Sequence, residues 1–173
     1  IGDNLGGRYV SFCLWIKLLI KKRRCIFVKV AIITDKPRVK YLPTEEGLLE
    51  DKQKRNTIKG IKRVLSERFD CIDMVFDDNT VGKLKKEKID LVFNLCNGIR
   101  GDARLSQLPA VLEYAGIPYT GSSPLGHGLA YNKIYSCRIF KESGVLTPNF
   151  IYVYDIKEIE NVNINYPVLV KPK

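Results

Sequence analysis

Strand-like and helix-like hydrophobic patterns alternate along this chain from about Val28 onward. The β-branched apolar run Phe27–Thr34 predicts a buried strand, and the Asp35-Lys36-Pro37 segment after it predicts a turn. Apolar residues then recur at helical spacing between Lys52 and Phe69, with lysines and arginines elsewhere, which predicts an amphipathic helix. The apolar residues of that helix are Ile58, Ile61, Leu65 and Phe69.

Further strands and helices follow in the same alternation. Cys71–Phe76 predicts a second strand from its alternating apolar residues, and Asp90–Leu95 predicts a third. Asp77–Thr80 offers capping side chains for a short helix, and Asp102 can cap a longer helix that ends at Gly116. The apolar residues of the longer helix are Leu105, Leu108, Leu112 and Ala115.

An extended segment, Ile117–Thr120, resumes after that helix. Because parallel strands need helical crossovers, this alternation predicts an α/β fold with an open, Rossmann-like parallel sheet that helices cover on both faces. We expect this amino-terminal domain to span residues 28–122.

From residue 123 the pattern changes, and we expect the start of a second domain over residues 123–173. Pro124–Tyr131 predicts only a short, weakly amphipathic connection. Asn132 can cap a helix from Lys133 to Glu142, which Gly144 would end. Its expected inward residues are Ile134, Cys137 and Phe140. Two strands, at 145–153 and 166–172, and a brief helical piece at 155–159 complete the prediction.

Composition places the chain among globular proteins, since 45% of its 173 residues are hydrophobic. Most of its net charge of +10 is local, because residues 1–29 hold seven cationic residues and one acidic residue. The apolar run in this segment is too short for a membrane span, and its positive cluster follows the apolar part, unlike a signal peptide. We expect residues 1–27 to lie outside the fold, and we expect neither a nucleic-acid nor a membrane partner.

The five cysteines are scattered and odd in number, and His127 is the single histidine. No C-x-x-C pair is present, so we expect neither a disulfide framework nor a zinc site. A reducing cytoplasm is the expected location.

Two places carry candidate chemistry. Asn97, Gly98, Arg100 and Gly101 follow the third predicted strand at its carboxyl end, where open α/β sheets bind ligands. Either this is a ligand loop, or the glycines only permit positive φ in a tight turn. Lys171 stands in an apolar strand pattern, where an ammonium group needs a partner such as a phosphate unless the strand end is exposed.

The ordered set F-N-L (93–95), G-I-P-Y-T-G-S (116–122), a capped lysine helix at Lys133, G-V-L-T-P (144–148) and V-K-P (170–172) resembles the D-alanine–D-alanine ligase family of ATP-grasp enzymes. The T-D-K-P segment that ends the first strand, Thr34 to Pro37, is similar to the ligase-like branch of that family. The resemblance covers about residues 28–173 and implies an amino-terminal α/β domain followed by the beginning of an ATP-grasp domain.

The resemblance implies ATP-dependent joining of two D-alanines through an acyl phosphate, for peptidoglycan synthesis in the cytoplasm. It assigns Lys133 and Lys171 to contacts with ATP phosphates, and it suggests a homodimer. It places the Mg²⁺ ligands and the late catalytic residues beyond Lys173, so none is assigned to this chain. We therefore expect the chain to be catalytically silent alone, and ADP release with D-alanine would contradict this.

The sequence also departs from the family pattern. Asn132 stands where the family usually has Asp, a change that keeps the helix cap, and Asn97 replaces the usual His. The early His-Glu pair of the first-substrate site is missing, so a ligase for other amino or hydroxy acids stays open as an alternative. A second alternative is a non-catalytic module that binds nucleic acid or anionic lipid through its basic amino terminus, with steep salt dependence abolished by deleting residues 1–28.

Overall fold

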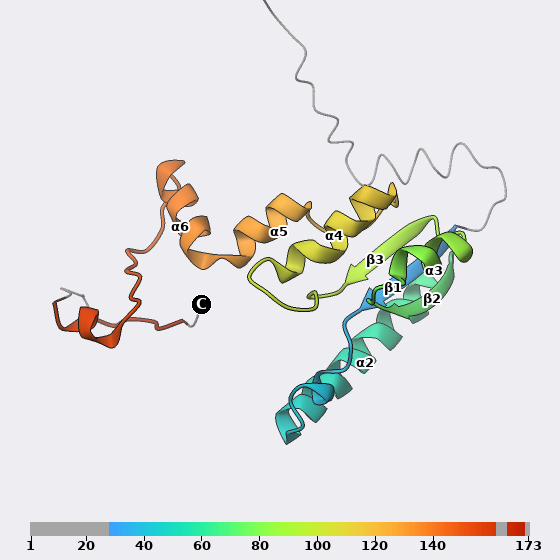
Figure 1. Cartoon of the computed structure of the whole chain (residues 1–173), viewed down its shortest axis with the longest axis horizontal. Helices are drawn as coiled ribbons and strands as arrows, with labels where there is room; N and C mark the ends of the chain where they lie inside the picture. Colours follow the sequence, from blue (N-terminus) through green and yellow to red (C-terminus); the bar gives the residue numbers. More distant parts are fainter. Residues whose placement is uncertain (1–27, 162–165, 172–173) are drawn as a thin grey trace, which may run out of the picture.

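The computed structural model describes residues 28–161 and 166–171, and its centre is a three-stranded parallel sheet (Figure 1). The strands are β1 (Lys29–Thr34), β2 (Asp70–Val75) and β3 (Leu91–Leu95), in the spatial order β2-β1-β3. The parallel α/β sheet expected from the sequence is confirmed. The basic segment 1–27, expected to lie outside the fold, falls outside the described residues.

Strand β1 is apolar throughout because it is the middle strand. Its Ile32 pairs in register with Asp73 of β2 on one side and with Phe93 of β3 on the other. Both faces of this strand are covered, and the four residues from Val30 to Ile33 are at most 1% exposed. A strand buried on both faces reads as a continuous apolar run rather than as an alternation.

Helices lie on both faces of the sheet (Figure 1). Helix α2 (Glu45–Leu65) covers one face, where its Ile61, Val64 and Leu65 lie beside Phe93 of β3. The opposite face carries α3 (Thr80–Lys86) and α4 (Arg104–Ala115). This arrangement fixes the carboxyl ends of β1 and β3 side by side at one edge of the domain.

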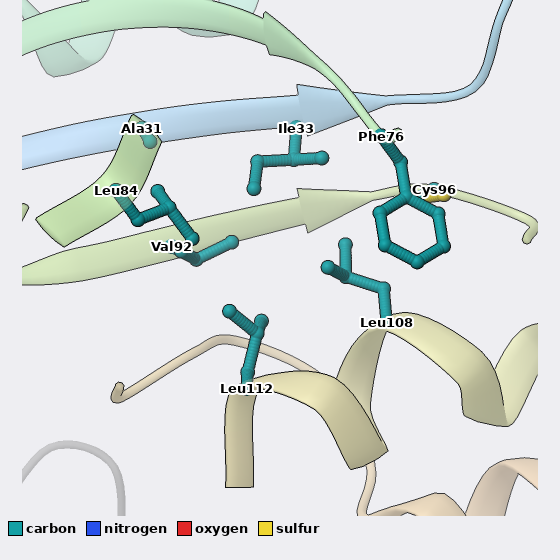
Figure 2. Close-up of a cluster of buried hydrophobic side chains, with 8 residues drawn as sticks. All are labelled: Ala31, Ile33, Phe76, Leu84, Val92, Cys96, Leu108 and Leu112. Carbon is teal, nitrogen blue, oxygen red and sulfur yellow. The ribbon is translucent and has the colours of Figure 1, made fainter. Parts of the chain in front are cut away.

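The main core lies between the sheet and helices α3 and α4 (Figure 2). Ala31, Ile33 and Val92 project from the sheet toward Leu108 and Leu112 of α4. The rest of the buried cluster consists of Phe76, Leu84 and Cys96. The predicted inward residues Leu108 and Leu112 of α4 are confirmed, with exposed fractions of 1% and 0%.

Helix α2 begins earlier than the apolar spacing predicted, at Glu45 rather than near Lys52. The Thr44 hydroxyl caps it by accepting a hydrogen bond from the Gly47 amide at 3.3 Å. Glu45 and Glu46 in the first turn are favourable there because the helix dipole is positive at that end. Leu48 and Leu49 in these first turns are each 55% exposed, so they do not belong to the buried apolar face from which the helix was predicted.

Asp51 of α2 holds the turn that follows β1. Its carboxylate accepts hydrogen bonds from the backbone amides of Arg38 and Val39 at 2.7 and 3.0 Å. Both amides belong to the first two residues of the short 3₁₀ helix η1 (Arg38–Lys40). The bonds from Val39 and Arg38 hold the pKa of Asp51 below its ordinary value, so Asp51 stays ionised and keeps η1 docked on α2.

One of the two predicted helix caps is wrong in detail. The residue before α4 is Ala103, which gives no side-chain cap, so the cap predicted at Asp102 lies one residue before the N-cap position of the helix. Before α3, the Asn79 side chain makes no cap bond, but two other members of the predicted group close the turn: the Thr80 hydroxyl accepts from the Asp77 amide at 2.8 Å, and the Asp77 carboxylate accepts from the Asn79 amide at 3.0 Å. Gly116 ends α4 as predicted, with a left-handed φ of 68°.

The region after Thr120 is helical where a connection was expected. Pro124–Tyr131 forms helix α5, capped by the Ser123 hydroxyl, and Lys133–Glu142 forms the predicted helix α6. The predicted inner side of α6 is only half-buried at Ile134 and Cys137, and Phe140 is 49% exposed.

The two strands predicted after α6 are absent from the described residues. Residues 145–153 and 166–171 contain no strand, and Leu146 and Val170 are 99% and 87% exposed. The brief helical piece is confirmed as the 3₁₀ helix η2 (Ile156–Asn161). The extended segment after α4 joins the sheet only through one parallel bridge, between Val92 and Tyr119.

Candidate functional site

A cleft of about 620 Å³ opens at the carboxyl ends of the strands. Its floor includes Phe76 and Leu95, which directly follow β2 and end β3, and its walls come from the turn after β1, from α2 and from Arg104. Open α/β sheets bind their ligands at this edge, because the chain must leave each strand there in a loop. We take this cleft as the candidate functional site.

A polar clamp ties the ends of β1 and β3 together inside the cleft. Asp35, the first residue after β1, pairs with Lys54 of α2 at 2.7 Å and accepts hydrogen bonds from the backbone and side-chain amides of Asn97. Burial disfavours the ionised form of Asp35, but the bonds from Lys54 and from its other partners outweigh it and lower the pKa of Asp35. Asp35 is therefore an ionised carboxylate whose two oxygens already bond Lys54 and Asn97.

The loop from Asn97 to Gly101 is held by the clamp at one end and by α4 at the other. Gln107 of α4 accepts from the Ile99 amide at 2.8 Å and donates to the Arg100 carbonyl oxygen at 2.7 Å. Burial raises the pKa of the neighbouring Cys96 thiol to about 12, so this cysteine packs the loop as a neutral group. These bonds fix the loop before any ligand arrives.

Of the four predicted loop residues, Asn97 and Gly98 line the cleft, and Arg100 and Gly101 are not among its lining residues. Gly98 and Gly101 have φ of 84° and 90°, so both adopt the positive φ that the turn interpretation requires. Gly98 also packs closely, since a Cβ there would lie 1.9 Å from the Arg104 carbonyl oxygen. The turn role is therefore present in the structure, and a role in binding stays a prediction.

Sequence reasoning missed Arg104, Lys36 and the Asp35–Lys54 pair, all of which line the cleft. Asp35 and Lys36 carried a signal, because they directly follow a buried strand. Arg104 carried another: it is the first residue of α4, where the positive end of the helix dipole disfavours a cation. Lys54 lies on an ordinary charged helix surface, so no sequence pattern singles it out.

Lys133 is the first residue of α6 and is exposed. The Asn132 carboxamide oxygen caps the helix by accepting from the amides of Ile134 and Tyr135 at 3.1 and 3.2 Å. The prediction that Asn132 keeps the cap is confirmed. Ser136 also donates to the Leu129 carbonyl oxygen at 2.7 Å, which fixes the turn between α5 and α6.

Lys171 is exposed in a described segment that forms no strand. Neither Lys171 nor Lys133 lines the cleft at the sheet edge. Their predicted contacts with nucleotide phosphates thus concern a different place from the cleft and stay predictions.

Neither a metal cluster nor a membrane helix occurs in the described part of the chain. Over residues 28–161 and 166–171, no three His, Cys, Asp or Glu side chains are grouped to hold a metal ion. Within the same residues, no helix is both long enough and apolar enough to cross a bilayer. The described residues therefore do not fit a resident Mg²⁺ site.

Comparison with known proteins shows which enzymes this chain is similar to in sequence. A D-alanine–D-alanine ligase from Thermoanaerobacter is 38% identical over 92 residues, 49% of this chain and 25% of its own length. Another from Lawsonia intracellularis is 34% identical over 102 residues, 58% of this chain and 33% of its own length. Over these stretches the chain is similar to D-alanine–D-alanine ligases. This confirms the resemblance drawn from the sequence motifs.

A third relative has no assigned function. An uncharacterized protein from Sinorhizobium fredii, y4sG, is 49% identical over 83 residues, 48% of this chain and 24% of its own length. The chain thus spans about a quarter to a third of the length of these relatives. No protein-family model matches the chain.

The crystal structure of a Bacillus anthracis D-alanine–D-alanine ligase complexed with ATP has the same fold over the shared region. Its TM-score is 0.54 at 18% identity, and the match covers 79% of this chain and 43% of that one. At this identity the likeness concerns the fold alone. It supports the α/β arrangement expected from the sequence.

Proposed function

We propose that this chain is part of an ATP-dependent carboxylate–amine ligase that works in the cytoplasm. The observation that carries the proposal is its identity of 34–38% with D-alanine–D-alanine ligases over stretches of 92 and 102 residues. By this relationship the enzyme activates one amino-acid carboxylate as an acyl phosphate and joins it to the amine of a second amino acid. D-Alanine is the substrate that the relatives' names suggest, and peptidoglycan synthesis is the role that the sequence resemblance implies.

The proposal gives Lys133 and Lys171 the role of binding ATP phosphates. A lysine ammonium is a mobile point charge that suits phosphate oxygens. Lys133 also stands at the amino terminus of α6, where backbone amides and the helix dipole attract anions. Together with bound ATP, these cations would stabilise the charge that develops on the transferred phosphoryl group. The described residues offer no carboxylate cluster for Mg²⁺.

We also propose the division into an amino-terminal domain, 28–122, and the beginning of an ATP-grasp domain, 123–173. All members of the main buried cluster lie between Ala31 and Leu112, which supports a self-contained first domain. Helix α6 buries no residue completely, and large apolar side chains after it, such as Leu146, stay exposed. Apolar surface of this kind is expected where a domain's remaining elements would pack.

Replacing Lys133 with glutamine tests the nucleotide site. We expect ATP affinity of the 173-residue chain to fall roughly tenfold or more, because a charge-assisted contact to a phosphate is lost. Isothermal titration calorimetry would measure the dissociation constant. Lys141→Gln, in the last turn of the same helix, is the matched control and should bind ATP as the unaltered chain does. Equal affinities of the two variants, or no ATP binding by the unaltered chain, would contradict the assignment.

A ligase for a different amino acid is the second candidate. The observation in its favour is Asn97, which occupies the cleft where the family usually has His and which is engaged with Asp35. A residue committed to an internal clamp contributes fewer free groups to a substrate. The charges of the cleft then decide which substrate it can hold.

A further inference from the structure

The acidic groups of the cleft are already satisfied. Three carboxylates line it, and each has partners within the protein. Asp35 is held by Lys54 and Asn97, Glu50 pairs with the Arg38 Nε at 3.4 Å, and Asp51 accepts two backbone amides. The cleft therefore has little free acceptor capacity for a ligand with a net positive charge.

Two of its cationic groups are not satisfied. Four cations line the cleft, and Arg38 and Lys54 are the two that pair with its carboxylates. Lys36 is exposed and forms no ion pair with any described residue. Arg104 likewise pairs with no carboxylate in the described chain, so the cleft holds a surplus of positive charge.

Arg104 is held in place without a counter-ion among the described residues. Its guanidinium carbon lies 5.3 Å from the centre of the Tyr131 ring on α5, and its Nε is buried without a hydrogen-bond partner. A buried donor without an acceptor is costly, and more so when it carries charge. A guanidinium stacked on an aromatic face keeps its in-plane N–H groups available for a planar anion.

The position of Arg104 in the fold adds a second electrostatic argument. It is the first residue of α4, and this helix has neither a side-chain cap nor an acidic residue in its first turn. A cation at this end is repelled by the helix dipole, whereas an anion placed there is attracted by both the dipole and the guanidinium. An anionic group at Arg104 would thus offset the unpaired positive charge at this end of α4.

We propose that this cleft selects an amino acid with a second carboxylate, such as D-glutamate or D-aspartate, and that Arg104, assisted by Lys36, binds this second carboxylate. The inference rests on the proposed ligase function and names the substrate class of that enzyme. Arginine matches a carboxylate with two parallel hydrogen bonds, which distinguishes an acidic amino acid from D-alanine by a charged pair rather than by size. Lys36 adds a mobile charge at the rim.

The test measures binding of free amino acids to the full 173-residue chain without nucleotide, by titration calorimetry. D-Glutamate or D-aspartate is expected to bind at least roughly tenfold more tightly than D-alanine, because a charged pair is gained. Arg104→Gln is expected to abolish this preference, and Arg104→Lys to restore only part of it, since lysine keeps the charge but not the planar fork. Lys36→Gln, on an exposed residue, is expected to weaken acidic amino acids alone.

Arg63→Gln is the matched control, because Arg63 is an exposed arginine of α2 that does not line the cleft. It should leave all affinities unchanged. The proposal is overturned if D-alanine binds as tightly as D-glutamate, if Arg104→Gln and Arg63→Gln behave alike, or if inorganic phosphate displaces D-glutamate at equal concentration. Because no ATP is present, a failure of the nucleotide assignment would leave this result intact, and a failure here would leave ATP binding intact.

Discussion

Replacing Gly98 with alanine is expected to destabilise the protein by about 2–4 kcal/mol, since it combines a positive φ with a close backbone contact. Gly98 has φ of 84°, and an added Cβ would lie 1.9 Å from the carbonyl oxygen of Arg104 and 2.5 Å from its carbonyl carbon. Backbone atoms at the start of α4 cannot move aside as a flexible side chain can. The free energy of unfolding, measured by urea titration, checks this expectation.

Gly101→Ala is the control that separates the two causes. Gly101 has a similar φ of 90°, but nothing lies within 4 Å of the position that its Cβ would take. Alanine there should cost only the conformational part, about 1–2 kcal/mol. If both variants lost the same stability, the close contact between Gly98 and α4 would not contribute to the cost. Only the positive φ of the two glycines would then explain the loss.

The parallel α/β fold could be predicted because its determinants are local. The apolar run of β1 ends at Asp35-Lys36-Pro37, and the helical spacing of Ile58, Ile61 and Leu65 is visible without knowledge of any partner. Gly116 likewise marks the end of α4 through its own backbone preference. Each of these patterns reports a periodicity or a φ angle, which the sequence encodes directly.

The prediction of two later strands was wrong because a strand forms only when a neighbouring strand pairs with it. The apolar segments at 145–153 and 166–171 have strand-like composition, but their backbone groups have no paired strand among the described residues. Propensity for a strand reflects packing on a sheet more than an intrinsic preference of the backbone. For Pro124–Tyr131 the error was the opposite one, since a helix formed where only a connection was predicted. This helix depends on the Ser123 cap and on packing against α4, including the bond from the Ser106 hydroxyl to the Pro124 carbonyl oxygen.

The candidate site was predictable only in part for the same reason. Asn97 and Gly98 were found because they follow a strand directly, and that position in the chain already locates them at the sheet edge. Lys54 and Arg104 reach the cleft through the packing of α2 and α4, and their meaning depends on which carboxylates are already paired. Which charges are paired can be seen only in the folded structure. The proposal of an acidic substrate therefore comes from the structure and not from a sequence motif.

Leu112→Ala is the second large effect that we expect, because it removes a side chain from the middle of the main core. Leu112 is fully buried on α4 and lies in the cluster with Leu108, Val92 and Ile33 (Figure 2). Truncating a buried leucine loses its burial and leaves a cavity, which costs about 2–5 kcal/mol. Urea unfolding followed by far-ultraviolet circular dichroism would measure the loss.

Leu125→Ala supplies the comparison for this truncation. Leu125 lies on α5 and is 71% exposed, so the same chemical change there should alter the free energy of unfolding by less than about 0.5 kcal/mol. The contrast matters because α4 carries both Leu112 in the core and Arg104 in the cleft. If Leu112→Ala were as mild as Leu125→Ala, α4 would not be anchored on the sheet, and the position of Arg104 in the cleft would lose its structural basis.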